Sequence, residues 1–495
     1  MKGFGEKRPK KKKKLHSLNK DININQLIER AFELQRQGHK IEAAKYYSYL
    51  IKNGIEDYRV FSNYGTFLKE DGKNKEAEIN LRKSIILNPE YANAYYNLAG
   101  IFIDKRDFQK AEIYLRQAIK LKPNFAIAHY NLGFLLKDLG RFKEAELHTL
   151  NALEVYPHLS DAYYSLSTLS KTNNDQKWQE KLFSKDILKN QNSRDLVNLF
   201  FARSNILHKK NKYEESSKNL ITANNLKLKT YKSDANFLIK KTNELKKSFN
   251  NLQDNSLEIS NDPISIFIVG LPRSGSTLIE SIISLNSQVT DLGEVNILEE
   301  SYKEYIDSSL KLNLGEIYKR KIQEINKKAS ITTNKWLFNY QYAGIIAALI
   351  PSARIIHCYR NPLDNILSIY RAHFFNSVRF SSSLIDCAKV YSDQKKIMQI
   401  YKNKFKQKIY DLNYDNLVND PVKEIKSLIN WLKWDWNEFY LLPHLNKRQI
   451  STRSNVEVRS PINSKSVGGW KNYKEMLKPA MEIITKDKEY KDLKY

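Results

Sequence analysis

Residues 264–285 read ISIFIVG, LPRSGST and LIESIISL in succession, and this stretch indicates the fold of the second half of the chain. The first run is rich in β-branched residues, as in a buried strand, and the last run has the composition of a helix. A strand, a Gly/Ser loop and a helix N-terminus form an anion cradle, because backbone N–H groups and the helix dipole point at a phosphate. The sequence therefore predicts a P-loop-like α/β domain with a central parallel sheet.

The loop differs from the nucleoside triphosphatase loop GxxxxGK[ST] at one position. Gly270, Gly275 and Thr277 are kept, but Ser276 stands where a triphosphatase needs lysine. This change argues against triphosphate hydrolysis and against a P-loop kinase, and it favours a ligand with one phosphate at this point. Arg273 supplies positive charge with the fork geometry that suits phosphate.

The loop PRSGST at 272–277 resembles the 5′-phosphosulfate loop of sulfotransferases. Residues 264–475 resemble the protein-tyrosine sulfotransferase branch, which implies 3′-phosphoadenosine 5′-phosphosulfate (PAPS) as co-substrate and no metal. By this resemblance Glu294 in DLGEV is the catalytic base, and Lys335 in TTNKW stabilises the transferring group together with Arg273. The expected nucleotide contacts are Pro272, Arg273, Ser274, Gly275, Ser276, Thr277, Arg360, Ser368, Tyr414, Lys465 and Lys471.

The chain departs from this branch at two places. The branch has a second arginine one turn after the serine, where this chain has Ala372 with Arg371 beside it. The loop VRSPINSKSVGGWKNY, which resembles the one that closes over the nucleotide, has Gly469 where a basic residue is usual, and Lys465 or Lys471 is the expected substitute. His373 is an alternative base, because aryl sulfotransferases use a histidine.

The first half of the chain repeats with a period of 34 residues. Several independent positions keep this period, among them Ala43, Ala77, Ala111 and Ala145. The pattern resembles the tetratricopeptide repeat, in which paired helices stack into a solenoid with a concave groove. Repeats are expected to begin near Asn25, Tyr58, Tyr91, Phe125 and Leu159, and a further helical pair is expected at 195–227.

One repeat position suggests a peptide groove. Asn63, Asn97 and Asn131 are equivalent, and a carboxamide both donates and accepts hydrogen bonds. A ladder of them resembles the one in O-GlcNAc transferases, which implies a clamp on an extended peptide backbone. The alternative is that these asparagines only pack the helix pair.

Composition sets the remaining expectations. The formal charge of +27 attracts anions, but charge alone does not choose among them. The lysine run at 10–14 reads as a solvated tail, with a membrane or nucleic-acid contact as the alternative. Two cysteines and no apolar signal core favour a bacterial cytoplasmic protein without a transmembrane segment. No nucleic-acid partner is expected, and the oligomeric state is left open.

These observations give a domain plan and a function. The plan is a basic tail at 1–22, a repeat solenoid at 23–228, a linker at 229–262 and a sulfotransferase domain at 263–495. The expected function is sulfuryl transfer from PAPS to a hydroxyl group, with tyrosine of a protein or peptide presented by the repeats as acceptor. A saccharide or lipid acceptor is the first alternative. A scaffold that binds nucleotide without catalysis is the second, although the presence of Glu294 and Lys335 argues against it.

Overall fold

The computed structural model describes residues 23–169, 176–252, 264–325, 330–374, 378–446, 448, 450 and 454–494. The basic tail at 1–22 and the linker segment at 253–262 therefore lie outside the described residues. The chain divides into two compact units, Met1–Leu135 and Leu136–Tyr495. The domain boundaries expected at residues 228 and 262 stay predictions.

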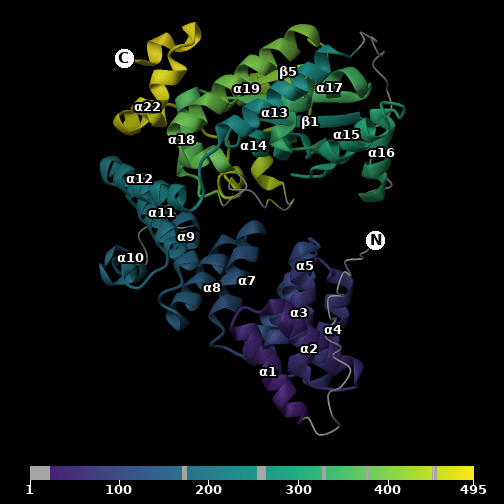
Figure 1. The fold of residues 1–495 in the computed structure, drawn as a ribbon. Helices are drawn as coiled ribbons and strands as arrows, with labels where there is room; N and C mark the ends of the chain where they lie inside the picture. The colour runs from purple at the N-terminus through teal and green to yellow at the C-terminus, as the bar shows by residue number, and fades with distance from the viewer. Residues whose placement is uncertain are drawn as a thin grey trace, which may run out of the picture. The chain divides into compact units, whose positions relative to one another are not determined.

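The first unit consists of antiparallel helix pairs (Figure 1). Its helices are α1 (Ile24–Arg36), α2 (Lys40–Lys52), α3 (Tyr58–Glu70), α4 (Asn74–Leu87), α5 (Ala92–Asp104), α6 (Phe108–Leu121) and the start of α7 (Ala126–Asp138). The repeating alanines are fully buried between paired helices. Gly65 shows why the partner position is small, since a Cβ there would lie 2.8 Å from Leu81 Cγ. The predicted helical repeats are confirmed.

The second unit begins with further helices of the same kind. They are α8 (Phe142–Val155), α9 (Ser160–Leu169), α10 (Gln176–Phe183), α11 (Ser193–Lys209), α12 (Tyr213–Thr230) and α13 (Ala235–Asn250), with the short 3₁₀ helix η1 (Asp186–Leu188) before α11. The helical pair expected at 195–227 is confirmed as α11 and α12. Asn224 Nδ2 on α12 donates to the carbonyl of Tyr370, so this pair is tied to the domain that follows.

The rest of the second unit is built on a five-stranded parallel sheet in the order β2-β3-β1-β4-β5. The strands are β1 (Ile264–Gly270), β2 (Val289–Asp291), β3 (Ile331–Asn334), β4 (Ala353–Tyr359) and β5 (Ile409–Asn413). In register, Ile266 of β1 lies beside Thr333 of β3 and Arg354 of β4. The chain fills one side of β1 first and then crosses to the other. Ligands of open α/β sheets bind outside the carboxyl ends of the strands at such a switch point.

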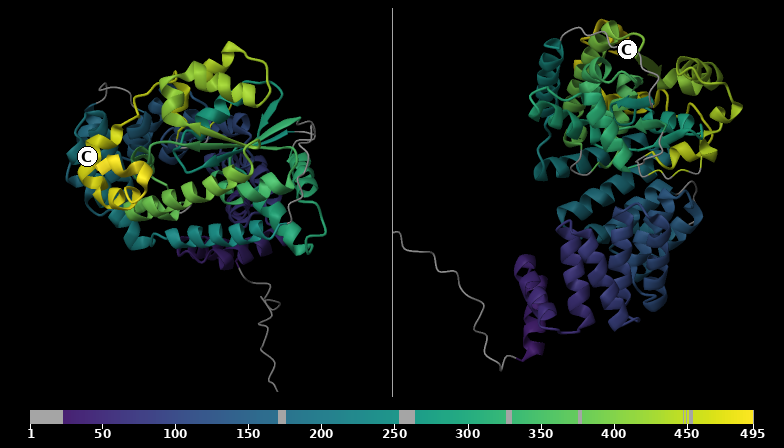
Figure 2. Two further views of the ribbon diagram at one scale, coloured as in Figure 1. Left: turned by 90° about the horizontal axis from the view of Figure 1, so that it is seen from above. Right: turned by 90° about the vertical axis from the view of Figure 1, so that its right-hand side faces the viewer.

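The remaining helices cover both faces of this sheet, as the left view of Figure 2 shows. They are α14 (Ser276–Ile283), α15 (Ile297–Asp307), α16 (Leu314–Ile325), α17 (Ala343–Leu349), α18 (Pro362–Arg371), α19 (Leu384–Lys404), α20 (Tyr414–Asn419), α21 (Pro421–Trp431) and α22 (Lys474–Ile484). Short 3₁₀ helices connect them: η2 (Leu337–Tyr342), η3 (Arg379–Ser382), η4 (Glu438–Leu441), η5 (Pro443–Leu445), η6 (Glu457–Arg459), η7 (Gly469–Tyr473) and η8 (Lys488–Lys494).

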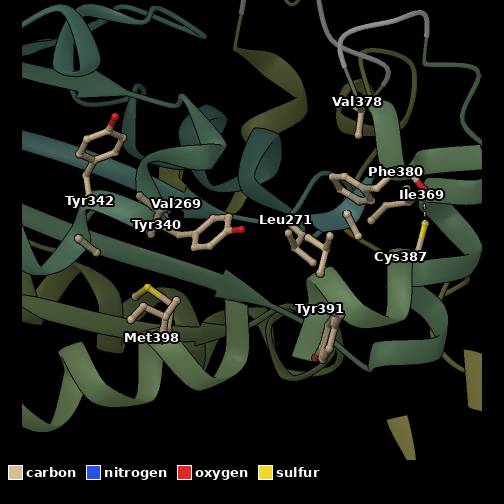
Figure 3. Close-up of a cluster of buried hydrophobic side chains, with 14 of the residues drawn as sticks. Val269, Leu271, Tyr340, Tyr342, Ile369, Val378, Phe380, Cys387, Tyr391 and Met398 are labelled. Carbon is tan, nitrogen blue, oxygen red and sulfur yellow. Dashed lines mark hydrogen bonds between the residues drawn. The ribbon is translucent and has the colours of Figure 1, made fainter. Parts of the chain in front are cut away.

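Alternation along β1 explains the two layers. Phe267 and Val269 belong to the apolar cluster that includes α13 and α15–α19, whereas Ile266 and Ile268 belong to the cluster with α14 and α21. Leu271, the first residue of the loop after β1, is buried in the former cluster (Figure 3). Burying a leucine side chain contributes about 1.5–3 kcal/mol, so this contact anchors the start of the loop.

Candidate active site

The loop between β1 and α14 has the backbone that its glycines allow. Gly270 and Gly275 have φ of +148° and +95°. A Cβ on Gly270 would lie 2.3 Å from the Cys358 carbonyl oxygen, and one on Gly275 would lie 2.3 Å from Tyr414 Cδ2. Ser274 Oγ is buried without a hydrogen-bond partner. The loop is therefore a tight turn that presents an unpaired polar atom beside the N-terminus of α14.

The side chain of Arg273 is held by three residues. Its Nε donates to Ser368 Oγ at 3.0 Å, one terminal nitrogen donates to Ser454 Oγ, and the other lies 2.6 Å from Glu457 Oε1. The Arg273 side chain is 14% exposed, whereas that of Glu457 is 60% exposed. Arg273 also has φ of +68°, which costs a non-glycine residue about 1–2 kcal/mol. The surrounding contacts hold the guanidinium in place despite this cost.

Glu294 and Lys335 form a close ion pair. Lys335 Nζ lies 2.6 Å from Glu294 Oε1, and the backbone N–H of Lys335 donates to the carbonyl of Gly293. Lys335 is only 1% exposed, because it follows the buried strand β3, whereas the Glu294 side chain is 44% exposed. The arrangement joins a buried cation to a carboxylate that solvent or a substrate can reach. The sequence placed both residues in one site, and the structure brings them together.

Arg360 follows β4, and its guanidinium lies 4.7 Å from the centre of the Tyr414 ring. It donates through Nη2 to the carbonyl of Ser466 at 2.8 Å, and Tyr414 Oη lies 3.2 Å from Ser466 Oγ. Since Tyr414 also lies against Gly275, these contacts connect the strand-end arginine to the anion loop. Ser368, which sequence reasoning grouped with Arg360, accepts instead from Arg273.

The segment that resembles a closing loop contacts Arg360, and Asp364 holds it in place. The carboxylate of Asp364 accepts the backbone N–H groups of Gly468 at 2.7 Å and Trp470 at 2.9 Å. Burial raises the pKa of Asp364 above its usual value, although the Trp470 amide and Arg360 act in the opposite direction. Lys465 and Lys471, the expected substitutes for the missing basic residue, are both exposed.

The two histidines near the site are held in other contacts. His373 is 3% exposed, with Nε2 at 2.9 Å from Asn198 Oδ1 and its ring stacked 4.6 Å from that of Phe201. His357 Nδ1 lies 2.8 Å from Asp411 Oδ1. These contacts give each imidazole a partner in the packed interior. They favour Glu294 over His373 as the base.

Four residues of the site were missed by the sequence interpretation. Glu280, on α14, is 1% exposed and lies 2.9 Å from Arg448 Nη1. Arg448 is the second missed residue. Glu457, which pairs with Arg273, and Asp364, which holds the segment around Gly468, are the third and fourth. Of these four residues, only Glu280 could have been identified from the sequence, because it is the one charged residue in the helix STLIESII. A carboxylate there must be paired, because charged side chains are almost never fully buried alone.

In the first unit, two asparagines of the expected ladder contact the preceding repeat. Asn97 Nδ2 donates to Ser62 Oγ at 3.3 Å, and Asn131 Nδ2 donates to Tyr96 Oη at 3.1 Å. Asn63, Asn97 and Asn131 are all half-buried. Packing therefore uses the amide donors of Asn97 and Asn131, and the peptide clamp stays a prediction.

Comparison with known families adds to this geometry. Residues 304–438 match the sulfotransferase family. The match supports sulfuryl transfer in general, and its range includes Lys335, Arg360 and Tyr414, while the loop at 270–277 and Glu294 precede it. Residues 92–125 and 114–146 match tetratricopeptide repeat models.

One curated relative and several solved structures resemble the chain. A protein of Aquifex aeolicus (strain VF5), named only as uncharacterized, is 28% identical over 312 residues, which are 57% of this chain and 41% of that protein. This chain thus spans about two fifths of that relative's length. PilF of Pseudomonas aeruginosa is 13% identical, with 41% of this chain and 91% of PilF covered and a TM-score of 0.33. The repeat protein YrrB is 19% identical, with 38% and 92% covered and a TM-score of 0.28.

Within the described residues, no cluster of three or more His, Cys, Asp or Glu side chains is placed to hold a metal ion. Among the helices of these same residues, none has the length and apolar character that crossing a membrane requires.

Proposed function

We propose that the C-terminal domain transfers a sulfuryl group from PAPS to an acceptor hydroxyl. The observation that carries the proposal is the pair of Lys335 and Glu294 in one unit with the glycine loop, at 2.6 Å from each other. A buried cation suits charge that develops in a transition state, and a reachable carboxylate suits removal of a proton. The family match at 304–438 supports the same reaction class.

The residues of the cradle fit the nucleotide that this reaction requires. Ser274 offers a buried hydroxyl without a partner, and Gly275 lets the Tyr414 ring approach the N-terminus of α14, where a Cβ would lie 2.3 Å from Tyr414 Cδ2. Arg273 and Arg360 add two guanidinium groups from different strand ends. We assign the 5′ end of the nucleotide to the loop 272–277, and the 3′-phosphate to Arg360 with Ser368.

In the proposed mechanism, PAPS supplies an activated sulfuryl group when it is bound. Glu294 takes the proton from the acceptor hydroxyl, which it can do because its carboxylate is partly exposed. As the acceptor oxygen bonds to sulfur, the bond from sulfur to the bridging phosphate oxygen breaks. Lys335 donates a hydrogen bond to this bridging oxygen, on which negative charge grows, and Arg273 adds a second cation. General base catalysis of this kind contributes about 10²–10⁴-fold to the rate. Burial of Lys335 keeps water from competing for that hydrogen bond.

The acceptor is proposed to be a tyrosine of a protein or peptide that the repeats recruit. Tetratricopeptide arrays form extended concave surfaces, which suit peptides better than small molecules. Incubating the full chain with radiolabelled sulfuryl donor, first with tyrosine-containing peptides and then with saccharides and lipids, tests this assignment. Label on saccharide or lipid alone would contradict the peptide acceptor and leave the reaction class intact.

The first experiment is calorimetric titration of the full chain with 3′-phosphoadenosine 5′-phosphate (PAP). We expect micromolar binding by the wild type and its loss in Arg273→Ala, since a charge-assisted contact to phosphate is worth about 1.5–3 kcal/mol. Arg379→Ala removes an exposed arginine of the same domain and serves as the matched control. A folded wild type that does not bind PAP would refute the proposal.

A second variant separates binding from catalysis. Glu294→Ala is expected to bind PAP like the wild type and to lose turnover of PAPS with any acceptor found. Retained turnover would remove Glu294 from the role of base.

A further inference from the structure

Two further carboxylates and one further cation lie beside the pair of Lys335 and Glu294. Lys335 Nζ lies 2.6 Å from Glu294 and also 3.9 Å from Glu280 Oε2. Glu280 Oε2 in turn lies 2.9 Å from Arg448 Nη1, and the same nitrogen lies 2.9 Å from Asp291 Oδ2. Lys335 and Glu280 are each 1% exposed. Arg448 therefore bridges Glu280 and Asp291, and Glu280 also lies near Lys335.

Glu280 competes with Glu294 for Lys335, because it is a second carboxylate that lies 3.9 Å from Lys335 Nζ. A fully buried carboxylate without a cation is strongly destabilised, so Glu280 must be paired in the folded protein. In the structure Arg448 provides that pairing, while Thr333 Oγ1 donates to Glu280 Oε1 at a longer 3.4 Å. Among the residues that the structure describes, Lys335, at 3.9 Å, is the other cation that pairs with Glu280. Moving Lys335 toward Glu280 would take its ammonium group away from Glu294 and from the donor.

Hydrogen bonds hold the Arg448 side chain against α14. Besides its two carboxylates it donates through Nη2 to Ser281 Oγ at 3.1 Å and to the carbonyl of Thr277 at 3.4 Å. Its neighbour Asn446 donates to the carbonyl of Ser281 at 2.9 Å. The guanidinium thus follows the side of α14 and is 9% exposed. Near this cluster, burial raises the pKa of Asp291, with Arg448 acting against the shift and Glu280 adding to it.

We infer that Arg448 is a positioning residue: by neutralising Glu280 it keeps the Lys335 ammonium group available to the sulfuryl group of the donor. This inference rests on the proposed function and extends it to residues outside the nucleotide loop. The donor itself touches neither Arg448 nor Glu280 in this account. Their effect on the sulfuryl group passes through Lys335.

The test compares affinities for PAP and PAPS, which differ only by the sulfuryl group. In Arg448→Met we expect PAPS affinity to fall at least about tenfold, the loss of one charge-assisted hydrogen bond, while PAP affinity stays unchanged. The double variant Glu280→Gln/Arg448→Met is expected to recover PAPS affinity, because it has no carboxylate to capture Lys335. Glu280→Gln alone is expected to bind PAPS at least as tightly as the wild type.

A control separates positioning from simple anchoring of the chain. Arg459 donates to the carbonyl oxygens of Arg448 and Asp138 but lies against no carboxylate of the cluster. Arg459→Met is therefore expected to lower the melting temperature without changing the ratio of the two affinities. Equal loss of PAP and PAPS binding in Arg448→Met, or no rescue by Glu280→Gln, would overturn the positioning role. A folded wild type that binds neither nucleotide would overturn the proposed function and this inference together.

Discussion

Replacing Glu457 by glutamine should strengthen nucleotide binding. In the structure its carboxylate lies 2.6 Å from Arg273, the arginine assigned to the phosphosulfate. A phosphate that binds this guanidinium meets the negative charge of Glu457 beside it, so the nucleotide must displace Glu457 or bind against its repulsion. Because the Glu457 side chain is 60% exposed, the pair is screened by solvent and is worth only about 0.5–1 kcal/mol. Removing it should lower the dissociation constant for PAP about two- to fivefold.

Calorimetric titration with PAP at low and at high ionic strength measures this effect. The increase in PAP affinity caused by Glu457→Gln should be smaller at high salt. Salt screens exposed charges, and the Debye length, about 10 Å at 0.1 M, becomes shorter as the salt concentration rises. Glu475→Gln is the matched control, since Glu475 is 81% exposed and pairs with Lys478 away from the loop. Weaker binding by Glu457→Gln would show that this carboxylate supports the nucleotide site instead of competing for it, and the reasoning would fail.

Three further predictions address the loop, the core and the repeats. Gly275→Ala should abolish PAP binding in a folded protein, because a Cβ at φ +95° would also displace Tyr414; unchanged calorimetric binding would contradict this. Burial, Arg371 and Lys209 lower the pKa of His208 from 6.5 to about 3, so folding stability should fall as pH drops below 6.5. At pH 5 this amounts to about 2 kcal/mol, and thermal denaturation of His208→Gln should lack it. Asn97→Ala should weaken a bound tyrosine peptide in fluorescence polarisation without changing PAP affinity; loss of helical structure in circular dichroism would instead indicate a packing role.

The repeats were predictable because their packing is local. Each repeat is one helix pair with its own buried alanine, so a period of 34 residues in the sequence already contains the packing pattern. The strand and loop at 264–277 were predictable for a similar reason, because the cradle is formed by consecutive residues. Small residues at Gly65 and Gly275 are required by contacts of 2.8 Å and 2.3 Å that a Cβ would make.

The partners of the reactive groups were not predictable in the same way. Arg273 and Glu457 are 184 positions apart, and neither neighbourhood has a repeat or a spacing that identifies the other. The hydrogen bond between Arg273 and Ser368 was equally unpredictable, because the two residues are 95 positions apart and follow different strands. Spacing along one segment predicts what lies on that segment. It carries no information about which segments meet above the sheet.

The described residues between 448 and 470 connect the separate parts of the site. This segment reaches Glu280 through Arg448, Arg273 through Glu457, and Arg360 through the carbonyl of Ser466. In the proposed function, this segment contacts two arginines that the nucleotide needs and neutralises the carboxylate that competes for Lys335, so it sets how many charges are available before the donor binds. A donor that takes Arg273 and Arg360 must replace the contacts of this segment. We therefore expect specificity for the sulfuryl group to depend on a part of the chain far from the loop proposed to bind phosphate.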